Sequence, residues 1–179
     1  MRWFWIDRFV EFESGRRAVA LKNVALAEEH LLDHFPGYPV MPHSLCVEGM
    51  AQTGGLLVGQ SSDFQARVVL AKLGKVTFHG HATPGDTLKY TAVVEDIRED
   101  GALVSTTSHR NGELHAEASI VFAHLDDDDT TRQLFLPHEF FGTLRALGVF
   151  DIGVNPDGTP IKPPQYMLDA ERAFINPGK

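Results

Sequence analysis

The chain has 179 residues, of which 43% are hydrophobic and 22% are charged, as in an ordinary soluble globular protein. This length fits one domain, or one domain with an appendage. The formal net charge is −8 at pH 7 and no stretch is strongly basic, so nucleic acid is not expected as a partner.

The N-terminal sequence, MRWFWIDRFVEF, is aromatic, but it reaches the charged residues Asp7, Arg8 and Glu11 too early for a signal peptide or a membrane-spanning helix. No apolar stretch has the roughly 18 residues that a spanning helix needs. The one cysteine, Cys46, allows no intrachain disulfide and favours a reducing compartment. We therefore expect a cytoplasmic protein without membrane association.

Residues 4–26 predict a β-hairpin. Apolar residues alternate weakly over 4–12, SGRR at 14–17 has the composition of a turn, and 18–26 alternates again as a returning strand. Residues 27–33 then favour a short helix.

A rigid loop leads from there into an apolar helix. Pro36, Pro39 and Pro42 fix the loop, because each proline restricts its own φ and the residue before it. Residues 44–60 are apolar on nearly every side, which predicts a long central helix that is buried on all faces. It contains four glycines, Gly49, Gly54, Gly55 and Gly59. A glycine weakens a helix by about 1 kcal/mol relative to alanine, so we expect close approach of neighbouring elements at these positions.

Four strand-like segments follow, at 67–80, 87–99, 102–110 and 113–125. The Asn-Gly pair at 111–112 is a strong hairpin signal between two alternating runs. The order of hairpin, buried helix and antiparallel meander predicts an α+β protein, in which an antiparallel sheet of about six strands wraps around a long central helix. This arrangement is the hot-dog fold. An open sheet leaves an edge, which pairing in a homodimer would cover.

The pattern changes after the last strand, so we expect a hot-dog domain over 1–125 and an acidic linker with a C-terminal extension over 126–179. The aspartates Asp126–Asp129 indicate a solvated linker. Residues 136–150 predict a short amphipathic helix. The proline-rich residues 151–179 predict extended or partly disordered chain that packs on the body or on a neighbouring subunit.

His34 and Glu48 are the residues best suited to chemistry. His34 precedes the rigid loop, and Glu48 is an acid within the apolar helix, where an unpaired carboxylate is costly. A histidine titrates near neutral pH and a desolvated carboxyl can stay protonated, so the two form a candidate acid–base pair. For His34 taken alone, the alternative is a structural histidine that braces the loop.

The surrounding segment, HFPGYPVMPHSLCVEGMAQTGG, closely resembles the active-site motif of the β-hydroxyacyl-ACP dehydratases of type II fatty acid synthesis. In that family the motif runs His-Phe-Pro-Gly-x-Pro-x-Met-Pro-Gly-Val-Leu-x-x-Glu-x-x-Ala-Gln, with the same spacing from His to Glu. The matching residues are His34, Phe35, Pro36, Gly37, Pro39, Met41, Pro42, Leu45, Glu48, Ala51 and Gln52. The N-terminal hairpin and the TPGD turn at 83–86 also resemble the family, so the resemblance covers about residues 3–125.

The resemblance implies the hot-dog fold, a homodimer or a trimer of dimers, and a site in which His from one subunit faces Glu from the other. It implies dehydration of (3R)-3-hydroxyacyl thioesters of acyl carrier protein or CoA to trans-2-enoyl thioesters, without a metal or an organic cofactor. His34 would remove the C2 proton, and Glu48 would protonate or orient the leaving hydroxyl. The thioester carbonyl would lie at the N-terminus of the central helix. The residues implied in substrate binding are Phe35, Pro42, His43, Ser44 and Gln52.

The chain departs from the family at two places. His43 and Ser44 replace the glycine and valine of the motif, so a ring and a less permissive backbone stand where the family glycine faces the substrate carbonyl. His79 and His81 lie where the family often has arginine or lysine, which would weaken the steering of an acidic carrier protein. The alternatives for the substrate are then a less acidic carrier, a fused carrier domain or a CoA ester. Two histidines alone are too few ligands to predict a metal site.

Two other functions stay open at this point. One is a hot-dog acyl thioesterase, which would direct water at the thioester carbonyl; the intact motif from His34 to Gln52 argues against it. The other is a non-catalytic acyl-binding or scaffold protein, whose pocket is closed by His43. A binder would keep its ligand affinity in His34→Ala and Glu48→Gln variants, whereas an enzyme would lose turnover.

Overall fold

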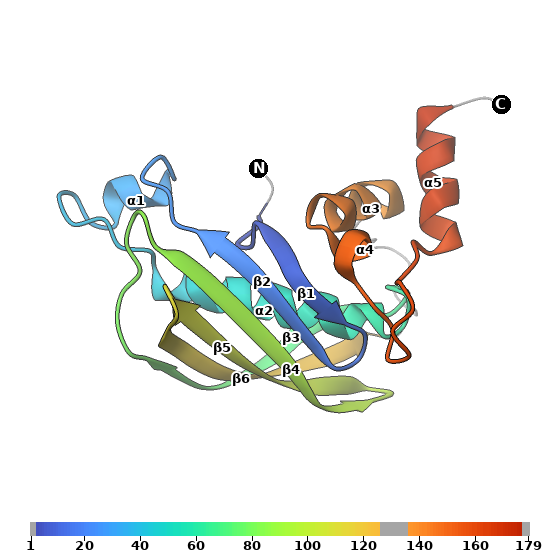
Figure 1. The fold of residues 1–179 in the computed structure, drawn as a ribbon, viewed down its shortest axis with the longest axis horizontal. Helices are drawn as coiled ribbons and strands as arrows, with labels where there is room; N and C mark the ends of the chain where they lie inside the picture. Colours follow the sequence, from blue (N-terminus) through green and yellow to red (C-terminus); the bar gives the residue numbers. More distant parts are fainter. Residues whose placement is uncertain (1–2, 126–135, 177–179) are drawn as a thin grey trace.

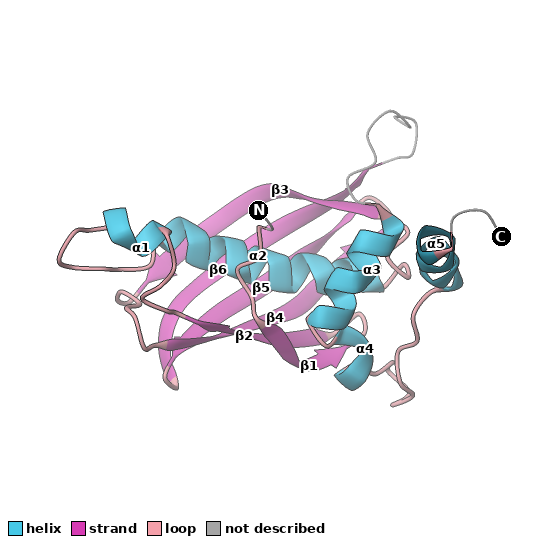
Figure 2. Ribbon diagram, turned by 90° about the horizontal axis from the view of Figure 1, so that it is seen from above, coloured by secondary structure: helices cyan, strands magenta, loops and turns pink. Residues whose placement is uncertain are grey.

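The computed structural model describes residues 3–125 and 136–176, in which a six-stranded antiparallel sheet carries a long helix across one face (Figure 1, Figure 2). In chain order the elements are β1 (Arg8–Glu13), β2 (Arg17–Asn23), α1 (His30–Asp33), α2 (His43–Gln60), β3 (Arg67–Phe78), β4 (Thr87–Arg98), β5 (Gly101–Arg110), β6 (Glu113–Leu125), α3 (Pro137–Ala146), α4 (Val149–Ile152) and α5 (Gln165–Ile175). The strand order is β1-β2-β4-β5-β6-β3, with every pair antiparallel. The predicted α+β hot-dog architecture is confirmed.

The glycines of α2 let the helix lie close to the sheet. A Cβ on Gly49 would lie 2.4 Å from Cε2 of Tyr90 in β4, and a Cβ on Gly54 would lie 3.1 Å from Cε2 of Phe122 in β6. A side chain at Gly49 would force its neighbours apart. The close approach predicted from the glycines is therefore confirmed at these two positions.

One face of α2 remains outside the core of the single chain. Ser44 is exposed, and Val47, Glu48, Gln52 and Leu56 are only half-buried. The prediction that the helix is buried on every face was wrong for the chain taken alone, because the sheet covers only one side of the helix (Figure 2). The uncovered side carries Glu48 and Gln52.

The two edges of the sheet differ. At the β1 edge the C-terminal extension continues the hydrogen bonding: the amide of Phe9 donates to the carbonyl of Leu147 at 2.8 Å, and the amide of Val154 donates to the carbonyl of Phe12 at 2.9 Å. At the other edge, β3 pairs only with β6 among the described strands, and residues 70–75 in its middle are exposed. The extension thus covers one edge and leaves the β3 edge open.

The extension is more regular than its composition suggests. The amphipathic helix predicted over 136–150 is confirmed as α3, with Phe141 and Leu144 buried. The prediction of extended or disordered chain after residue 150 was wrong at α5, because that segment has no internal glycine or proline and buries Met167. Arg145 of α3 pairs with Glu171 of α5 at 3.0 Å.

The extension also contacts the region that precedes β3. The hydroxyl of Tyr166 donates to the backbone carbonyl of Phe64 at 3.0 Å. The predicted linker at Asp126–Asp129 lies outside the described residues. None of the described helices combines the length and the apolarity that crossing a membrane requires.

Candidate active site

The loop after α1 is closed by its own backbone. Phe35 and Tyr38 exchange hydrogen bonds, from the amide of Phe35 to the carbonyl of Tyr38 at 3.0 Å and in the reverse direction at 2.9 Å. Gly37 between them has a φ of +77°, which glycine adopts without steric cost. The amide of Val40 then donates to the carbonyl of His34 at 2.8 Å. The prolines and the glycine therefore hold His34 at the base of a fixed turn.

The ring of His34 is oriented by the same loop. Its Nδ1 lies 2.9 Å from the carbonyl oxygen of Val40, and the half-buried ring stacks on Phe35 with centroids 4.3 Å apart. A carbonyl oxygen can only accept, so Nδ1 carries the proton and Nε2 keeps its lone pair in the neutral ring. This tautomer is the one that a base acting through Nε2 requires.

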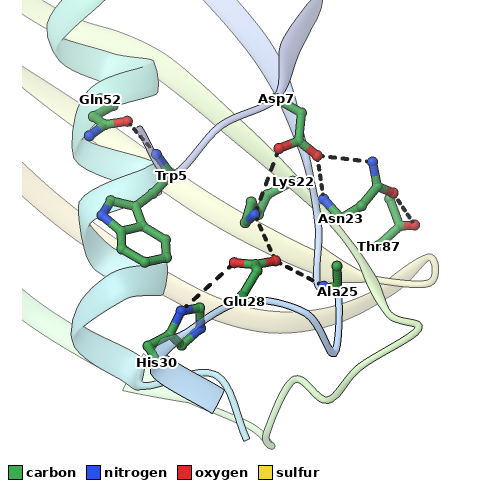
Figure 3. Close-up of polar contacts among 9 residues, drawn as sticks. All are labelled: Trp5, Asp7, Lys22, Asn23, Ala25, Glu28, His30, Gln52 and Thr87. Carbon is green, nitrogen blue, oxygen red and sulfur yellow. Dashed lines mark hydrogen bonds and ion pairs between the residues drawn. The ribbon is translucent and has the colours of Figure 1, made fainter. Parts of the chain in front are cut away.

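Glu48 lies in the second turn of α2 and is held by a side chain one turn later. The Nε2 group of Gln52 donates to Oε1 of Glu48 at 3.0 Å. The Oε1 atom of Gln52 accepts a hydrogen bond from the amide of Trp5 at 2.9 Å, which Figure 3 shows. The half-buried side chain is thus held by a neutral amide, and its second oxygen has no hydrogen bond or ion pair among the described residues.

The structure does not join His34 to Glu48 within one chain. Among the described residues, no hydrogen bond or ion pair connects the two side chains, and each has the local partner given above. Glu48 lies on the half-exposed side of α2, where the sheet does not cover the helix. A single chain therefore presents two separate halves of the predicted acid–base pair.

His43 is the first residue of α2 and fits there without backbone strain. His43 is not among the described residues with positive φ. The prediction that a histidine in place of the family glycine would strain the backbone was therefore wrong. Its ring stacks on Phe78 with centroids 3.8 Å apart and planes at 3°, and Nε2 lies 3.2 Å from the carbonyl of Gly80. Burial lowers the pKa of His43, which the hydrogen bond to Gly80 opposes only in part. The ring is accordingly neutral near pH 7.

The start of α2 offers free backbone donors. Pro42 is the N-cap, and within the described residues no side chain caps this end. The amides of His43 and Ser44 precede the first intrahelical hydrogen bonds, which Leu45 and Cys46 make to the carbonyl of Pro42. Such amides and the helix dipole favour negative charge at this end.

The predicted substrate-binding residues lie in three places. Pro42, His43 and Ser44 form the start of α2; Phe35 is exposed on the loop beside His34; and Gln52 lies on the uncovered side of α2. Both polar atoms of the Gln52 amide are already hydrogen-bonded, to Glu48 and to the N-terminal segment. This leaves the amide little capacity to bind a substrate.

The histidines after β3 face two different partners. His79 pairs with Glu117 at 3.4 Å, and the ring of His81 stacks on His43 with centroids 5.0 Å apart. In the part of the chain that the structure describes, no group of three or more His, Cys, Asp or Glu residues could hold a metal ion.

Sequence reasoning missed His115 and Trp5. The ring of His115 is buried, and its Nδ1 forms a hydrogen bond with the hydroxyl of Ser108 at 3.2 Å. Burial lowers the pKa of His115. The backbone of Trp5 binds the side chain of Gln52. The alternation of β6 could have identified His115 as inward-facing, but no local pattern links Trp5 to a helix 47 residues later.

Known proteins resemble the part of the chain that contains the sheet and α2. Residues 3–124 match the family described as FabA-like domain. The 3-hydroxyacyl-[acyl-carrier-protein] dehydratase FabZ of Herpetosiphon aurantiacus is 36% identical over 122 residues, which cover 68% of this chain and 86% of that protein. The FabZ of Geobacillus thermodenitrificans is 39% identical over 124 residues, which cover 66% of this chain and 82% of that protein.

A solved structure shares the fold. The dehydratase heterocomplex ApeI:P from Xenorhabdus doucetiae aligns with a TM-score of 0.59 at 13% identity, over 72% of this chain and 87% of the matched chain. At this identity the likeness shows the fold alone. The family match ends at residue 124, before α3, so it does not cover the extension.

Proposed function

Because the chain belongs to the FabA-like family, with FabZ dehydratases among its relatives, we propose that it removes water from (3R)-3-hydroxyacyl thioesters to give trans-2-enoyl thioesters. It is then a hydro-lyase of fatty acid synthesis, with residues 1–125 as the catalytic domain and residues 126–179 as an extension. The observation that carries this proposal is the orientation of His34, whose Nδ1–H is held by Val40 so that Nε2 can accept a proton.

In the proposed reaction, Nε2 of His34 takes the proton from C2 of the substrate. The electron pair of that C–H bond forms the C2–C3 double bond, and the C3–O bond breaks. The hydroxyl leaves as water with the proton of Glu48, which acts as a carboxylic acid in this step and ends as a carboxylate. The amides of His43 and Ser44 stabilise the charge that develops on the thioester carbonyl oxygen. Phe35 and Pro42 line the approach to this position. No step calls for a metal or an organic cofactor.

The proposed assembly is a homodimer in which His34 of one chain faces Glu48 of the other. Two features support it: the two side chains do not meet within one chain, and the β3 edge is open for pairing with a second copy. A trimer of such dimers stays a prediction, which a mass measurement in solution decides. The buried Cys46 forms no disulfide, which agrees with a reducing compartment, and a cytoplasmic enzyme is part of this proposal.

The test is the reverse reaction, hydration of trans-2-enoyl thioesters, followed by loss of the enoyl absorbance. Crotonyl and longer acyl groups are offered on CoA and on acyl carrier protein, and free thiol is measured in the same samples. Loss of absorbance without thiol release supports the dehydratase and identifies the carrier. Thiol release would indicate a thioesterase, and binding without either reaction would indicate an acyl-binding protein.

A further inference from the structure

The side-chain amide of Gln52 ties the proposed acid to the N-terminal segment, residues 3–5. Its Oε1 accepts from the amide of Trp5 at 2.9 Å, and its Nε2 donates to the carbonyl of Trp3 at 2.8 Å and to Glu48 at 3.0 Å. A carbonyl and a carboxylate can only accept, whereas a backbone N–H can only donate. The three contacts therefore allow only one orientation of the Gln52 amide.

The N-terminal segment lies directly on α2 beside Glu48. A Cβ added to Gly49 would come within 2.7 Å of the carbonyl oxygen of Trp5. The residue that follows Glu48 is thus a glycine against which the backbone of Trp5 packs. This contact fixes the position along α2 at which the N-terminal segment crosses the helix.

The indole of Trp5 contacts the element that leads to His34. Its ring meets the ring of His30 edge to face, with centroids 5.1 Å apart and planes at 75°. His30 begins α1, and His34 is the C-cap of that helix. Figure 3 shows Trp5 between Gln52 on α2 and His30. One residue of the N-terminal segment therefore touches both the base-bearing and the acid-bearing parts of the site.

Charged groups anchor the segment on its other side. Asp7 accepts hydrogen bonds from the amide of Asn23 at 2.7 Å and from Nδ2 of Asn23 at 3.0 Å. The buried ammonium of Lys22 lies 3.7 Å from Asp7 and 3.0 Å from Glu28, and 6.0 Å from the centre of the Trp5 ring (Figure 3). These contacts hold residue 7, and with it the path of residues 3–5.

We propose that residues 3–5 act as a positioning element for Glu48, through the Gln52 amide. With Oε1 of Glu48 fixed by Gln52, Oε2 is the oxygen turned to the leaving hydroxyl. Without the amide of Trp5, Gln52 can rotate and the carboxylate loses its set direction. This inference rests on the proposed function, because it assigns a use to the acid of that reaction. The segment itself touches no reacting atom.

The first test removes a single backbone donor. Trp5→Pro deletes the N–H that binds Gln52, and we expect kcat to fall about 10-fold to 100-fold with KM nearly unchanged, as for a misplaced catalytic group. Trp5→Phe keeps the N–H and an aromatic ring, and should lose far less turnover than Trp5→Pro. Equal turnover in these two variants would overturn the proposal.

The second test is a double-mutant cycle. Gln52→Ala removes the link between the segment and Glu48, so Trp5→Pro should cause little further loss in that background. A loss of the same size in both backgrounds would mean that Trp5→Pro acts by general disruption, and would overturn the proposal. If Trp5→Pro does not fold, the cycle is run with a chain that lacks residues 1–3 and carries Phe4→Met. This chain lacks the carbonyl of Trp3, which accepts a hydrogen bond from Nε2 of Gln52.

The proposed function and the positioning role of residues 3–5 fail under different outcomes. If the wild type neither hydrates nor dehydrates thioesters, the proposed function fails, and this inference fails with it. If the wild type is active and Glu48→Gln loses turnover, but the cycle is additive, the function stands and only the positioning role of residues 3–5 is wrong.

Discussion

The proposed base and the proposed acid are held by contacts of very different range. The ring of His34 binds the carbonyl of Val40, six positions along the same loop. Glu48 binds Gln52 within α2, but Gln52 in turn depends on Trp5, 47 positions away. The base is oriented by a turn that the local sequence specifies, whereas the acid is oriented only once the N-terminal segment has packed on α2.

This difference has consequences for robustness. A turn with fixed prolines orders itself locally and needs little from the rest of the fold. A relay of hydrogen bonds between distant segments is lost when any one member is displaced, because the remaining polar groups stay unpaired. Substitutions around His34 should therefore act locally, and substitutions around Glu48 should act at a distance.

The largest expected effect comes from removing the base. His34→Ala should lower turnover about 10³-fold, since general base catalysis contributes about 10²–10⁴-fold. Steady-state hydration of crotonyl thioester measures it, with His79→Ala as the control because the side chain of His79 pairs with Glu117 at the surface of the sheet. Turnover of His34→Ala within a few-fold of wild type would show that His34 merely braces its loop.

Glu48→Gln should lower turnover about 10²-fold, because the amide cannot give a proton to the leaving hydroxyl. The substitution keeps the size of the side chain and an oxygen that can accept from Gln52, so the free energy of unfolding should hardly change. Urea denaturation and the hydration assay together separate the two effects. A variant that loses stability in proportion to its turnover would instead assign Glu48 a structural role.

Adding a methyl group at Gly49 should destabilise the acid side of the site by about 1–3 kcal/mol, through overpacking against Tyr90 and Trp5. At Gly37 in the base loop, alanine should lower the free energy of unfolding by about 1–2 kcal/mol, because its φ of +77° disfavours a Cβ. Gly142→Ala in α3 is the matched control, with no atom within 4 Å of the new Cβ. Denaturant unfolding of the three variants checks this ranking, which equal effects at all three positions would contradict.

The smallest effect concerns the pH dependence of stability. Burial lowers the pKa of His43 from 6.5, so the folded chain resists a proton that the unfolded chain accepts. The resulting loss of stability is absent above the unfolded pKa and grows as the pH falls below it. His43→Gln should therefore flatten the decrease in the free energy of unfolding between about pH 7.5 and pH 5.5. Identical slopes of unfolding free energy against pH in the two proteins would show that His43 does not cause the pH dependence. His30 and His115 would then cause it, since burial lowers the pKa of both.

Local pattern was sufficient for most of the fold. The hairpin turn at 111–112 lies between β5 and β6, which end at Arg110 and begin at Glu113 as the alternation predicted. Period-two runs and Asn-Gly turns are properties of neighbouring residues, so they can be read without knowing the fold. The motif around His34 and Glu48 likewise made the family recognisable.

Contacts between distant segments were not predictable in the same way. The pairing of Val154 with β1, and the link from Trp5 to Gln52, join residues with no shared sequence signal. The helix α5 was missed because the prolines before it dominated the composition of residues 151–179. His43 was expected to be strained, but it is the first residue of α2 and lies outside the positive-φ region, so its backbone needs no glycine.

The most direct test of a site shared between two chains is a mixed dimer. Differently tagged His34→Ala and Glu48→Gln chains are coexpressed, and the heterodimer is isolated through both tags. If His34 of one chain works with Glu48 of the other, one of the two sites is intact, and the heterodimer should regain about half of the wild-type turnover. A heterodimer as inactive as its parents would contradict a site that is shared between two chains.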